Sequence, residues 1–224
     1  MFAVSLFEDN RERPKRDARV GMLPPKLAQT IINLAVGQNR DTNLTILDPF
    51  CGTGVLLQEA QLMGYNAYGT DLEPRMVEYS QANLDWLPTK FRVSDTSFTL
   101  EQGDATNHHW QSPIDLVACE TYLGKPFTSA PAPDVLAKTA SEVDLILKKF
   151  LKNIHGQIQP GTRLCIAVPA WQIRPNQFKH LPLIDQIEHL GYNRIRFEHV
   201  RDTQLLYYRE DQIVARELLV LTRI

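Results

Sequence analysis

The sequence has few cysteines, few histidines and no long apolar run. Its three cysteines, Cys51, Cys119 and Cys165, lie far apart and form no Cys-x-x-Cys pair. We therefore expect neither a disulfide framework nor a zinc site, and a reducing cytoplasm fits this pattern. The adjacent His108 and His109 lack further ligands nearby in the sequence, so we expect no metal site there either. No apolar run reaches the roughly 18 residues of a membrane span, and no signal-peptide pattern is present.

The composition is that of an ordinary soluble globular protein. A chain of 224 residues with 43% hydrophobic and 22% charged residues is expected to form one domain with a substantial core. The net charge of −2 hides an asymmetry, since residues 41–120 carry twelve acidic and three basic side chains, and residues 138–180 carry two acidic and seven basic ones. A basic flank fits a polyanionic partner, although solvated helix faces explain such runs equally well.

The pattern predicts an N-terminal arm over residues 1–20 and a single domain over residues 21–224. Within the domain, strands and helices alternate, which predicts a parallel doubly wound sheet. A terminal run of β-rich segments predicts an antiparallel addition at its edge. The first four expected strands are 44–48, 66–71, 97–102 and 114–119. Residues 160–169 form a turn that leads into a fifth strand, and further strands are expected at 194–200, 204–208 and 213–223. The expected helices start at Pro24-Pro25, cover 54–64 and 73–87, start again at an Asp134 cap, and lie around 181–190.

The strongest motif is "ILDPFCGTG" at residues 46–54. Ligands of doubly wound sheets bind beyond the carboxyl ends of the strands, and Gly52 and Gly54 permit a tight turn that a ligand can approach closely. A dinucleotide fingerprint would have a third glycine where Leu57 stands. The motif therefore indicates a nucleoside ligand of another kind.

Two acids follow the next two strands. Asp71 ends the second strand, where it is placed to accept hydrogen bonds from both hydroxyls of a ribose. Asp104, in "QGDAT", follows the third strand, where a carboxylate can accept from the exocyclic amine of adenine. An adenosine ligand without a pyrophosphate satisfies both positions. The alternative is that these acids cap helices or turns.

These motifs, in this order, resemble class I S-adenosylmethionine-dependent methyltransferases, which are Rossmann-like with a seven-stranded sheet. Residues 20–125, with "LPPKLAQTIINLA" and "GYNAYGTDLEPRMV", are similar to the catalytic domain of THUMP-associated tRNA guanosine-N2-methyltransferases. The resemblance implies S-adenosylmethionine as cofactor and tRNA as the RNA substrate. It implies that Pro24 and Lys26 close the site. The other cofactor residues it implies are Asp48, Phe50, Cys51, Gly52 and Gly54 at the methionine end, Asp71 at the ribose, and Leu72, Asp104 and Ala105 around the adenine.

The chain departs from this family in two ways. Barely twenty residues precede the methyltransferase-like region, so we expect no THUMP domain. After the fourth strand the family carries an acid or amide, two prolines and an aromatic, where this chain has Glu120-Thr121-Tyr122-Leu123. Glu120 keeps an acceptor for an amine, Tyr122 or Phe127 supplies a stacking face, and Thr121 either bonds a base edge or fills space.

Three interpretations of this tip stay open. Glu120 orients an exocyclic amine of a nucleobase in RNA; or the acceptor is DNA, protein or a small molecule; or the chain binds cofactor or RNA without transferring a methyl group. Cys119 as a nucleophile for pyrimidine methylation is less favoured than a buried structural role. A basic-aromatic loop at 171–182, including Trp171, Arg174, Phe178 and Lys179, suits single-stranded nucleic acid. The alternative is an ordinary loop with a core aromatic. Without its own RNA-binding domain, the chain would use such a surface, a homodimer or a partner subunit to hold RNA.

Overall fold

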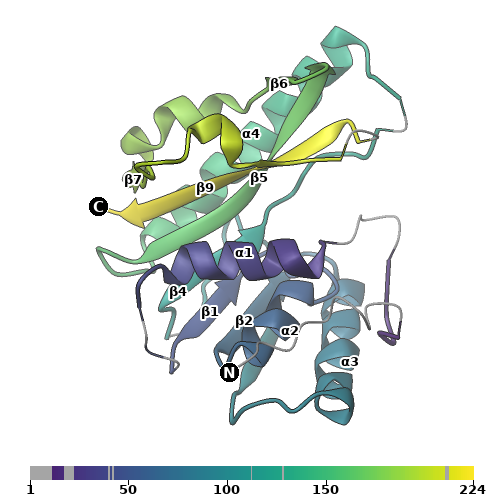
Figure 1. Ribbon diagram of the computed structural model, residues 1–224, viewed down its shortest axis with the longest axis vertical. Helices are drawn as coiled ribbons and strands as arrows, with labels where there is room; N and C mark the ends of the chain where they lie inside the picture. Colours follow the sequence, from purple (N-terminus) through teal and green to yellow (C-terminus); the bar gives the residue numbers. More distant parts are fainter. Residues whose placement is uncertain are drawn as a thin grey trace.

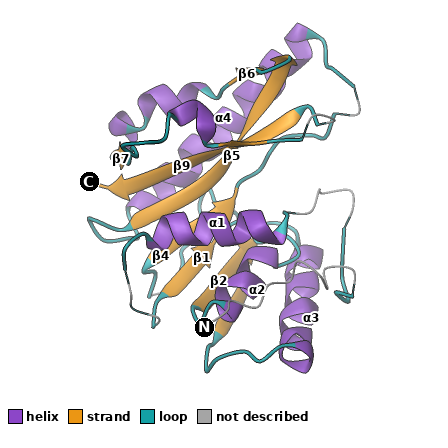
Figure 2. Cartoon of the chain, viewed as in Figure 1, coloured by secondary structure: helices purple, strands orange, loops and turns teal. Residues whose placement is uncertain are grey.

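The computed structural model describes residues 12–17, 23–39, 41, 43–111, 113–127, 129–209 and 212–224. Across these residues one nine-stranded sheet has helices on both faces (Figure 1, Figure 2). The α-helices are α1 (Pro25–Val36), α2 (Val55–Leu62), α3 (Pro74–Lys90) and α4 (Pro133–His155). The strands are β1 (Thr45–Asp48), β2 (Asn66–Asp71), β3 (Phe98–Gln102), β4 (Leu116–Glu120), β5 (Arg163–Arg174), β6 (Gln177–Lys179), β7 (Tyr192–Arg194), β8 (Leu206–Tyr207) and β9 (Val214–Arg223).

The sheet is doubly wound. Its strands run in the order β3-β2-β1-β4-β5-β9-β7, and every pair from β3 to β5 is parallel. The chain steps outward from β1 to β3 and then returns to β4 on the other side of β1. At such a reversal the loops that follow the two central strands diverge, which leaves a crevice at their carboxyl ends. The fold therefore places its natural binding site beyond Asp48 and Glu120.

The C-terminal part adds antiparallel strands to this core. Strand β9 pairs with β5 over nine residue pairs, from Arg163↔Thr222 to Trp171↔Val214. Strand β7 pairs with the C-terminal part of β9, and β8 pairs with the N-terminal half of β9. Strand β6 folds back on the end of β5. Both β5 and β9 extend beyond the tip of β4 (Figure 2), so side chains of β9 reach the same edge of the sheet as Glu120.

Each face of the sheet buries its own cluster. Alternate strand residues such as Leu47, Val117 and Ile166 pack with α4, whereas Ile46 and Cys165 pack with α1 and α2. This alternation is the period of two expected for strands. Figure 1 shows α1 and α4 on opposite sides of the sheet. The predicted fold class, a mostly parallel doubly wound sheet with an antiparallel C-terminal edge, is confirmed. The sheet has nine strands rather than the expected seven, because β6 and β8 pair beside the seven strands of its main path.

Several predicted boundaries were wrong. Helix α3 continues through Pro88 to Lys90. Pro88 has no N–H to donate to the Leu84 carbonyl, which costs one helical hydrogen bond, but the buried side chains of Leu84 and Leu87 hold the helix against the domain. Asp134 is not the cap of α4, since Ala132 occupies that position and Asp134 lies in the first turn. There its negative charge interacts favourably with the positive end of the helix dipole.

Three C-terminal segments also differ from the prediction. Residues 181–190 form two short 3₁₀ helices, Pro182–Gln186 and Glu188–Leu190. The strand expected at 194–200 is limited to β7 and one isolated bridge between Phe197 and Val200. The expected loop at 171–182 is a β-hairpin of β5 and β6. Of the arm predicted at 1–20, residues 1–11 and 18–20 lie outside the described residues.

Candidate active site

A cavity of about 700 Å³ lies at the carboxyl ends of β1, β2 and β4. Its walls are the turn after β1, the residues after β2, the loop after β3, the tip of β4, two turns of α4, and Asp17 and Leu23 from the N-terminal side. It brings together most of the predicted site residues: Asp48, Phe50, Cys51, Gly52, Asp71, Leu72, Asp104, Ala105, Glu120, Thr121 and Tyr122.

The turn after β1 exposes backbone to the cavity. Gly52 has φ 52°, and a Cβ built on it would meet no protein atom closer than 4.0 Å, so a side chain there would enter the cavity that Gly52 lines. Gly54, at φ 78°, faces inward instead, since its Cβ would lie 2.9 Å from Ser80 Oγ. The Ser80 hydroxyl donates to the Gly52 carbonyl at 2.8 Å. Gly54 thus fits the turn against α3, and Gly52 leaves room for a ligand.

Asp71 connects the first two motifs. Its Oδ2 accepts the backbone N–H of Gly52 at 2.9 Å, and its Oδ1 accepts that of Glu73 at 3.0 Å. Each carboxylate oxygen can accept a further hydrogen bond, so the side chain is fixed without losing its capacity for a diol. Leu72, 60% exposed, lies beside it on the cavity rim and offers an apolar contact.

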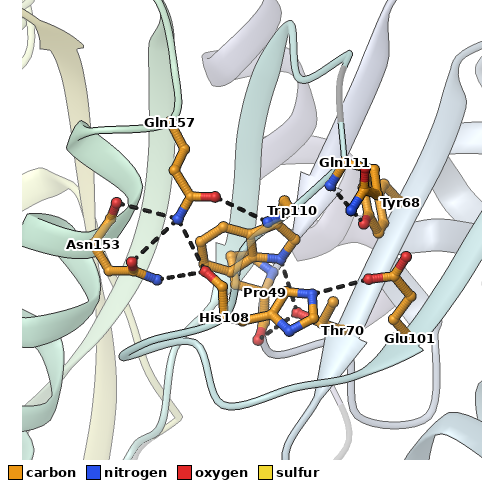
Figure 3. Close-up of polar contacts among 9 residues, drawn as sticks. All are labelled: Pro49, Tyr68, Thr70, Glu101, His108, Trp110, Gln111, Asn153 and Gln157. Carbon is orange, nitrogen blue, oxygen red and sulfur yellow. Dashed lines mark hydrogen bonds and ion pairs between the residues drawn. The ribbon is translucent and has the colours of Figure 1, made fainter.

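The loop after β3 is held by a polar network that reaches α4 (Figure 3). The Asn153 amide donates to the carbonyl of His108 at 2.8 Å. It also donates to the carbonyl of Ala105 at 3.1 Å. Gln157 accepts the Trp110 backbone N–H at 2.9 Å, and the Trp110 indole donates to Thr70 Oγ1 at 3.2 Å. The network thus ties this loop to β2 and α4, and it fixes Ala105 at the cavity wall.

Asp104 lies in the same loop. Its Oδ1 accepts the Thr106 N–H at 2.9 Å, and its backbone carbonyl accepts the N–H groups of Asn107 and His108. Asp104 therefore does shape a turn, as the alternative interpretation required. It also lines the cavity, so the two interpretations are compatible.

The cavity is electronegative. Six acidic side chains and two basic ones line it; the acids are Asp17, Asp48, Asp71, Glu73, Asp104 and Glu120, and the bases are Arg75 and Lys149. Burial, and then the nearby Asp71 and Glu120 charges, raise the pKa of Asp48 well above its usual value. Burial also raises the pKa of Asp71. This environment favours a cationic ligand and disfavours a pyrophosphate.

At the tip of β4 the acid predicted to orient the acceptor forms an ion pair. Glu120 Oε1 lies 2.6 Å from Nε of Arg216 on β9. Burial raises the pKa of Glu120, while the Arg216 charge and hydrogen bond lower it. Tyr122, 41% exposed, stands at the cavity mouth with a ring available for stacking.

Thr121 is used within the fold. Its backbone N–H and its hydroxyl both donate to the carbonyl of Ala167 at 3.0 Å, and the residue is buried. Two roles were left open for Thr121, bonding a base edge or filling space, and this geometry agrees with the second. Its two bonds to Ala167 also hold the tip of β4. Cys119 is fully buried, which agrees with a structural role.

Some predicted residues lie apart from the cavity walls. Pro24 precedes α1, and its carbonyl accepts the N–H groups of Leu27 and Ala28. Lys26 is exposed on α1, and Gly54 packs against Ser80. Trp171, which was considered for base stacking, has no exposed surface and belongs to the cluster under α4.

Sequence reasoning missed contributions from both ends of the chain. Asp17 lines the cavity and pairs with Arg75 at 2.9 Å. Arg13 donates to the Thr53 carbonyl at 2.7 Å, and burial lowers its pKa to about 10. These residues lie in a mixed-charge stretch without periodicity, and Arg216 lies in an ordinary strand. No sequence signal distinguishes them.

In the described part of the chain, no group of three or more His, Cys, Asp or Glu side chains is arranged to hold a metal ion. Its helices also include none with the length and apolarity needed to cross a membrane.

Comparisons with known proteins identify the domain. Residues 13–173 match the family model described as RMKL-like, methyltransferase domain. Two curated relatives are named tRNA (guanine(10)-N2)-dimethyltransferase. The one from Methanothermobacter thermautotrophicus is 32% identical over 150 residues, or 66% of this chain and 39% of the relative. The one from Pyrococcus abyssi is 31% identical over 167 residues, or 73% and 44%.

A solved structure agrees in fold. The crystal structure of TrmN from Thermus thermophilus superposes with a TM-score of 0.61 at 18% identity, covering 98% of this chain and 53% of that one. The chain thus spans about half of that protein and less than half of the two curated relatives. The methyltransferase resemblance in the sequence is confirmed, and the chain belongs to the family of RMKL-like methyltransferase domains.

Proposed function

We propose that this protein is an S-adenosylmethionine-dependent methyltransferase that methylates an exocyclic amine of a nucleobase in RNA, of the tRNA guanosine-N2 type. The observation that carries the proposal is the convergence of Asp48, Asp71, Asp104 and Glu120 on one cavity of about 700 Å³. Family membership, and the names of the relatives that share it, support methyl transfer to RNA.

The cavity fits the cofactor. Asp71 would accept from the ribose hydroxyls and Asp104 from the adenine amine, while Leu72 and Ala105 would contact the ring. The room in front of Gly52 and the acidic walls suit a positively charged sulfonium with a methionine tail. When bound, this group supplies an electrophilic methyl carbon. The protein's task is then to orient the acceptor, because methyl transfer needs little acid–base help.

Glu120 is the residue proposed to orient the acceptor. Its Oε1 is bonded to Arg216, and among the described residues its Oε2 makes no hydrogen bond, so Oε2 would accept an N–H of the amine. The nitrogen lone pair would then point at the methyl carbon, with the Tyr122 ring stacking on the base. After transfer, the extra proton on nitrogen leaves to solvent or to Oε2.

RNA would contact the surface around the cavity mouth. The β5–β6 hairpin carries exposed Arg174 and half-buried Phe178, whose ring packs edge-on against Tyr208 at 5.0 Å. A homodimer or partner subunit would enlarge this surface, since the RNA needs more contacts than one cavity provides. We also propose a cytoplasmic location, supported by the three unpaired, buried cysteines.

The test is to incubate the protein with methyl-labelled S-adenosylmethionine and pools of RNA, DNA and protein, and to map the labelled nucleoside by mass spectrometry. We expect label in RNA, as N2-methylguanosine, and none with Glu120→Gln. Label in DNA or protein would show that the protein transfers a methyl group but that its acceptor is not RNA. Absence of label, together with absence of cofactor binding by calorimetry, would refute the reaction itself.

A further inference from the structure

Arg216 lies behind the proposed catalytic carboxylate. Its Nε donates to Glu120 Oε1 at 2.6 Å, and the side chains of Arg216 and Glu120 are only 8% and 15% exposed. The two residues are 96 positions apart and meet because β5 separates their strands: Glu120 pairs with Ala167, and Arg216 pairs with Pro169. The contact thus depends on the antiparallel addition, which lies outside the residues matched by the family model.

Arg216 reaches the reaction only through Glu120. Glu120 lines the cavity, whereas Arg216 is not part of the wall formed by the described residues. Another guanidinium nitrogen, Nη1, lies 3.5 Å from Gln212 Oε1. With its Nε on Glu120 and its position behind the wall, Arg216 is placed to orient the carboxylate.

The tip of β4, Glu120-Thr121-Tyr122-Leu123, contains no proline, and contacts with neighbouring strands hold it in place. Thr121 bonds twice to the carbonyl of Ala167 on β5. Arg216 on β9 fixes the side chain of the preceding residue. Together these bonds hold both the backbone and the carboxylate, which is the task of a preorganised site.

The charge of Arg216 also matters because the surroundings of Glu120 oppose ionisation. Burial raises the pKa of Glu120, and Arg216 lowers it. The other ionisable groups around it are the Asp48 carboxyl at the end of β1, the buried Cys119 thiol and, across the cavity, Lys149 of α4 and Asp71. Among the described residues, only Arg216 pairs directly with the carboxylate.

We propose that Arg216 is a positioning residue for methyl transfer, which holds Glu120 Oε1 by a direct ion pair so that Oε2 is presented to the acceptor amine. The role in transfer rests on the proposed function, whereas the effect on Glu120 does not. A protonated or rotating Glu120 would present a donor, or no fixed acceptor, to the amine. Arg216 would therefore affect turnover and its pH dependence but not cofactor affinity.

The first experiment measures ionisation without catalysis. The Glu120 carboxyl is followed by ¹³C NMR in glutamate-labelled protein and assigned by its loss in Glu120→Gln. We expect Arg216→Met to raise the titration midpoint by about one to three pH units. The matched control is Arg194→Met. It removes a partly buried arginine of β7, which pairs with Asp202 and Glu217, and it should leave the midpoint in place. An unchanged midpoint in Arg216→Met would overturn the proposal.

The second experiment measures kcat against pH with the RNA identified above. Arg216→Met should lower kcat at pH 7 about tenfold or more and move the acid limb of its pH profile upward, with calorimetric cofactor affinity unchanged. Arg216→Lys should keep the acid limb of the pH profile at its wild-type position, because the positive charge remains. It should restore only part of the wild-type kcat, because an ammonium group lacks the planar guanidinium fork. If Arg216→Met does not fold, the lower kcat of Arg216→Lys tests the positioning role in its place.

The two proposals fail in different ways. If the wild type transfers no methyl group to RNA, the proposed function fails, and the NMR titration still decides the ionisation of Glu120. If the wild type is active and Arg216→Met has the same kcat and pH profile, the positioning role is wrong. A loss of activity accompanied by an equal loss of cofactor affinity would indicate general damage and would equally refute it.

Discussion

The backbone N–H of Gly52 donates a hydrogen bond to Asp71 Oδ2 at 2.9 Å, so the turn after β1 and the acid after β2 form one unit. Removing the Asp71 side chain therefore has two effects: it deletes the proposed ribose acceptor and releases the turn. We expect Asp71→Ala to weaken S-adenosylmethionine binding about a hundredfold, as measured by calorimetry. Asp85→Ala, which removes an exposed carboxylate of α3, is the control. Equal affinities in the two variants would contradict the ribose role.

Glu120→Gln should abolish methyl transfer and leave cofactor affinity nearly unchanged. The glutamine amide has one oxygen and one NH₂ group, and Arg216 Nε, 2.6 Å from Oε1, would take the oxygen. The NH₂ group would then face the amine of the acceptor, a donor against a donor. We expect kcat to fall by about 10² or more, as measured by label incorporation. Wild-type turnover in this variant would remove Glu120 from the mechanism.

The sequence predicted the parallel half of the fold well, since each signal there is local. Glycine and proline positions bound α2 and open α3, and apolar runs mark β1 and β4. The acids after β1, β2 and β4 converge because parallel strands bring their carboxyl ends to one edge. Most of the cavity could therefore be named from motifs alone.

The antiparallel half was harder to predict because its contacts join residues far apart in the chain. Strand β5 pairs with β9 as far as Trp171 and with β6 from Trp171 to Arg174, so the segment expected as a loop forms a hairpin and Trp171 is buried. The Glu120–Arg216 pair depends on the same long-range register. Nothing in the local pattern around Arg216 indicates its partner.

Gly52→Ala and Gly54→Ala should separate binding from stability. A Cβ at Gly54 would lie 2.9 Å from Ser80 Oγ at φ 78°, so we expect a loss of stability of about 1–3 kcal/mol, measured by urea unfolding. A Cβ at Gly52 has free space in the cavity, so this variant should lose less stability and more cofactor affinity. The opposite order of effects would show that the cofactor does not approach Gly52.

Asp48→Asn should stabilise the protein while weakening cofactor binding. Burial raises the folded-state pKa of Asp48 above its unfolded value, so the folded state binds the proton more tightly. Wild-type stability attributable to Asp48 therefore falls as pH rises from the unfolded pKa to the folded pKa. Asparagine keeps an oxygen for the Phe50 N–H, which Asp48 Oδ1 accepts at 3.1 Å.

The advantage of Asp48→Asn should consequently be small near pH 4 and grow as the pH rises towards the folded-state pKa, as measured by chemical unfolding from pH 4 to pH 8. Cofactor affinity should fall at the same time, because a negative charge near the sulfonium is lost. A stability difference that does not change with pH would show that Asp48 titrates normally.

Asn83→Ala should release residues 12–17 from the domain. The Asn83 amide donates to the carbonyls of Lys15 and Thr53, at 2.9 and 2.8 Å, and its Oδ1 accepts the Lys15 N–H at 3.0 Å. Removing the amide breaks all three bonds at a buried position. Local opening exposes the nearby basic residues to trypsin, so cleavage after Lys15 and Arg16 should accelerate about tenfold or more.

The control for this prediction is Gln81→Ala on the exposed face of the same helix; among the described residues, its amide donates only to Asp85. It should be cleaved at the wild-type rate. Asp17, which lines the cavity and pairs with Arg75, lies in the segment that Asn83 holds. Asn83→Ala should therefore also weaken cofactor binding, measured by calorimetry, by about three- to tenfold. Faster cleavage with unchanged affinity would show that the segment covers the domain without shaping the site.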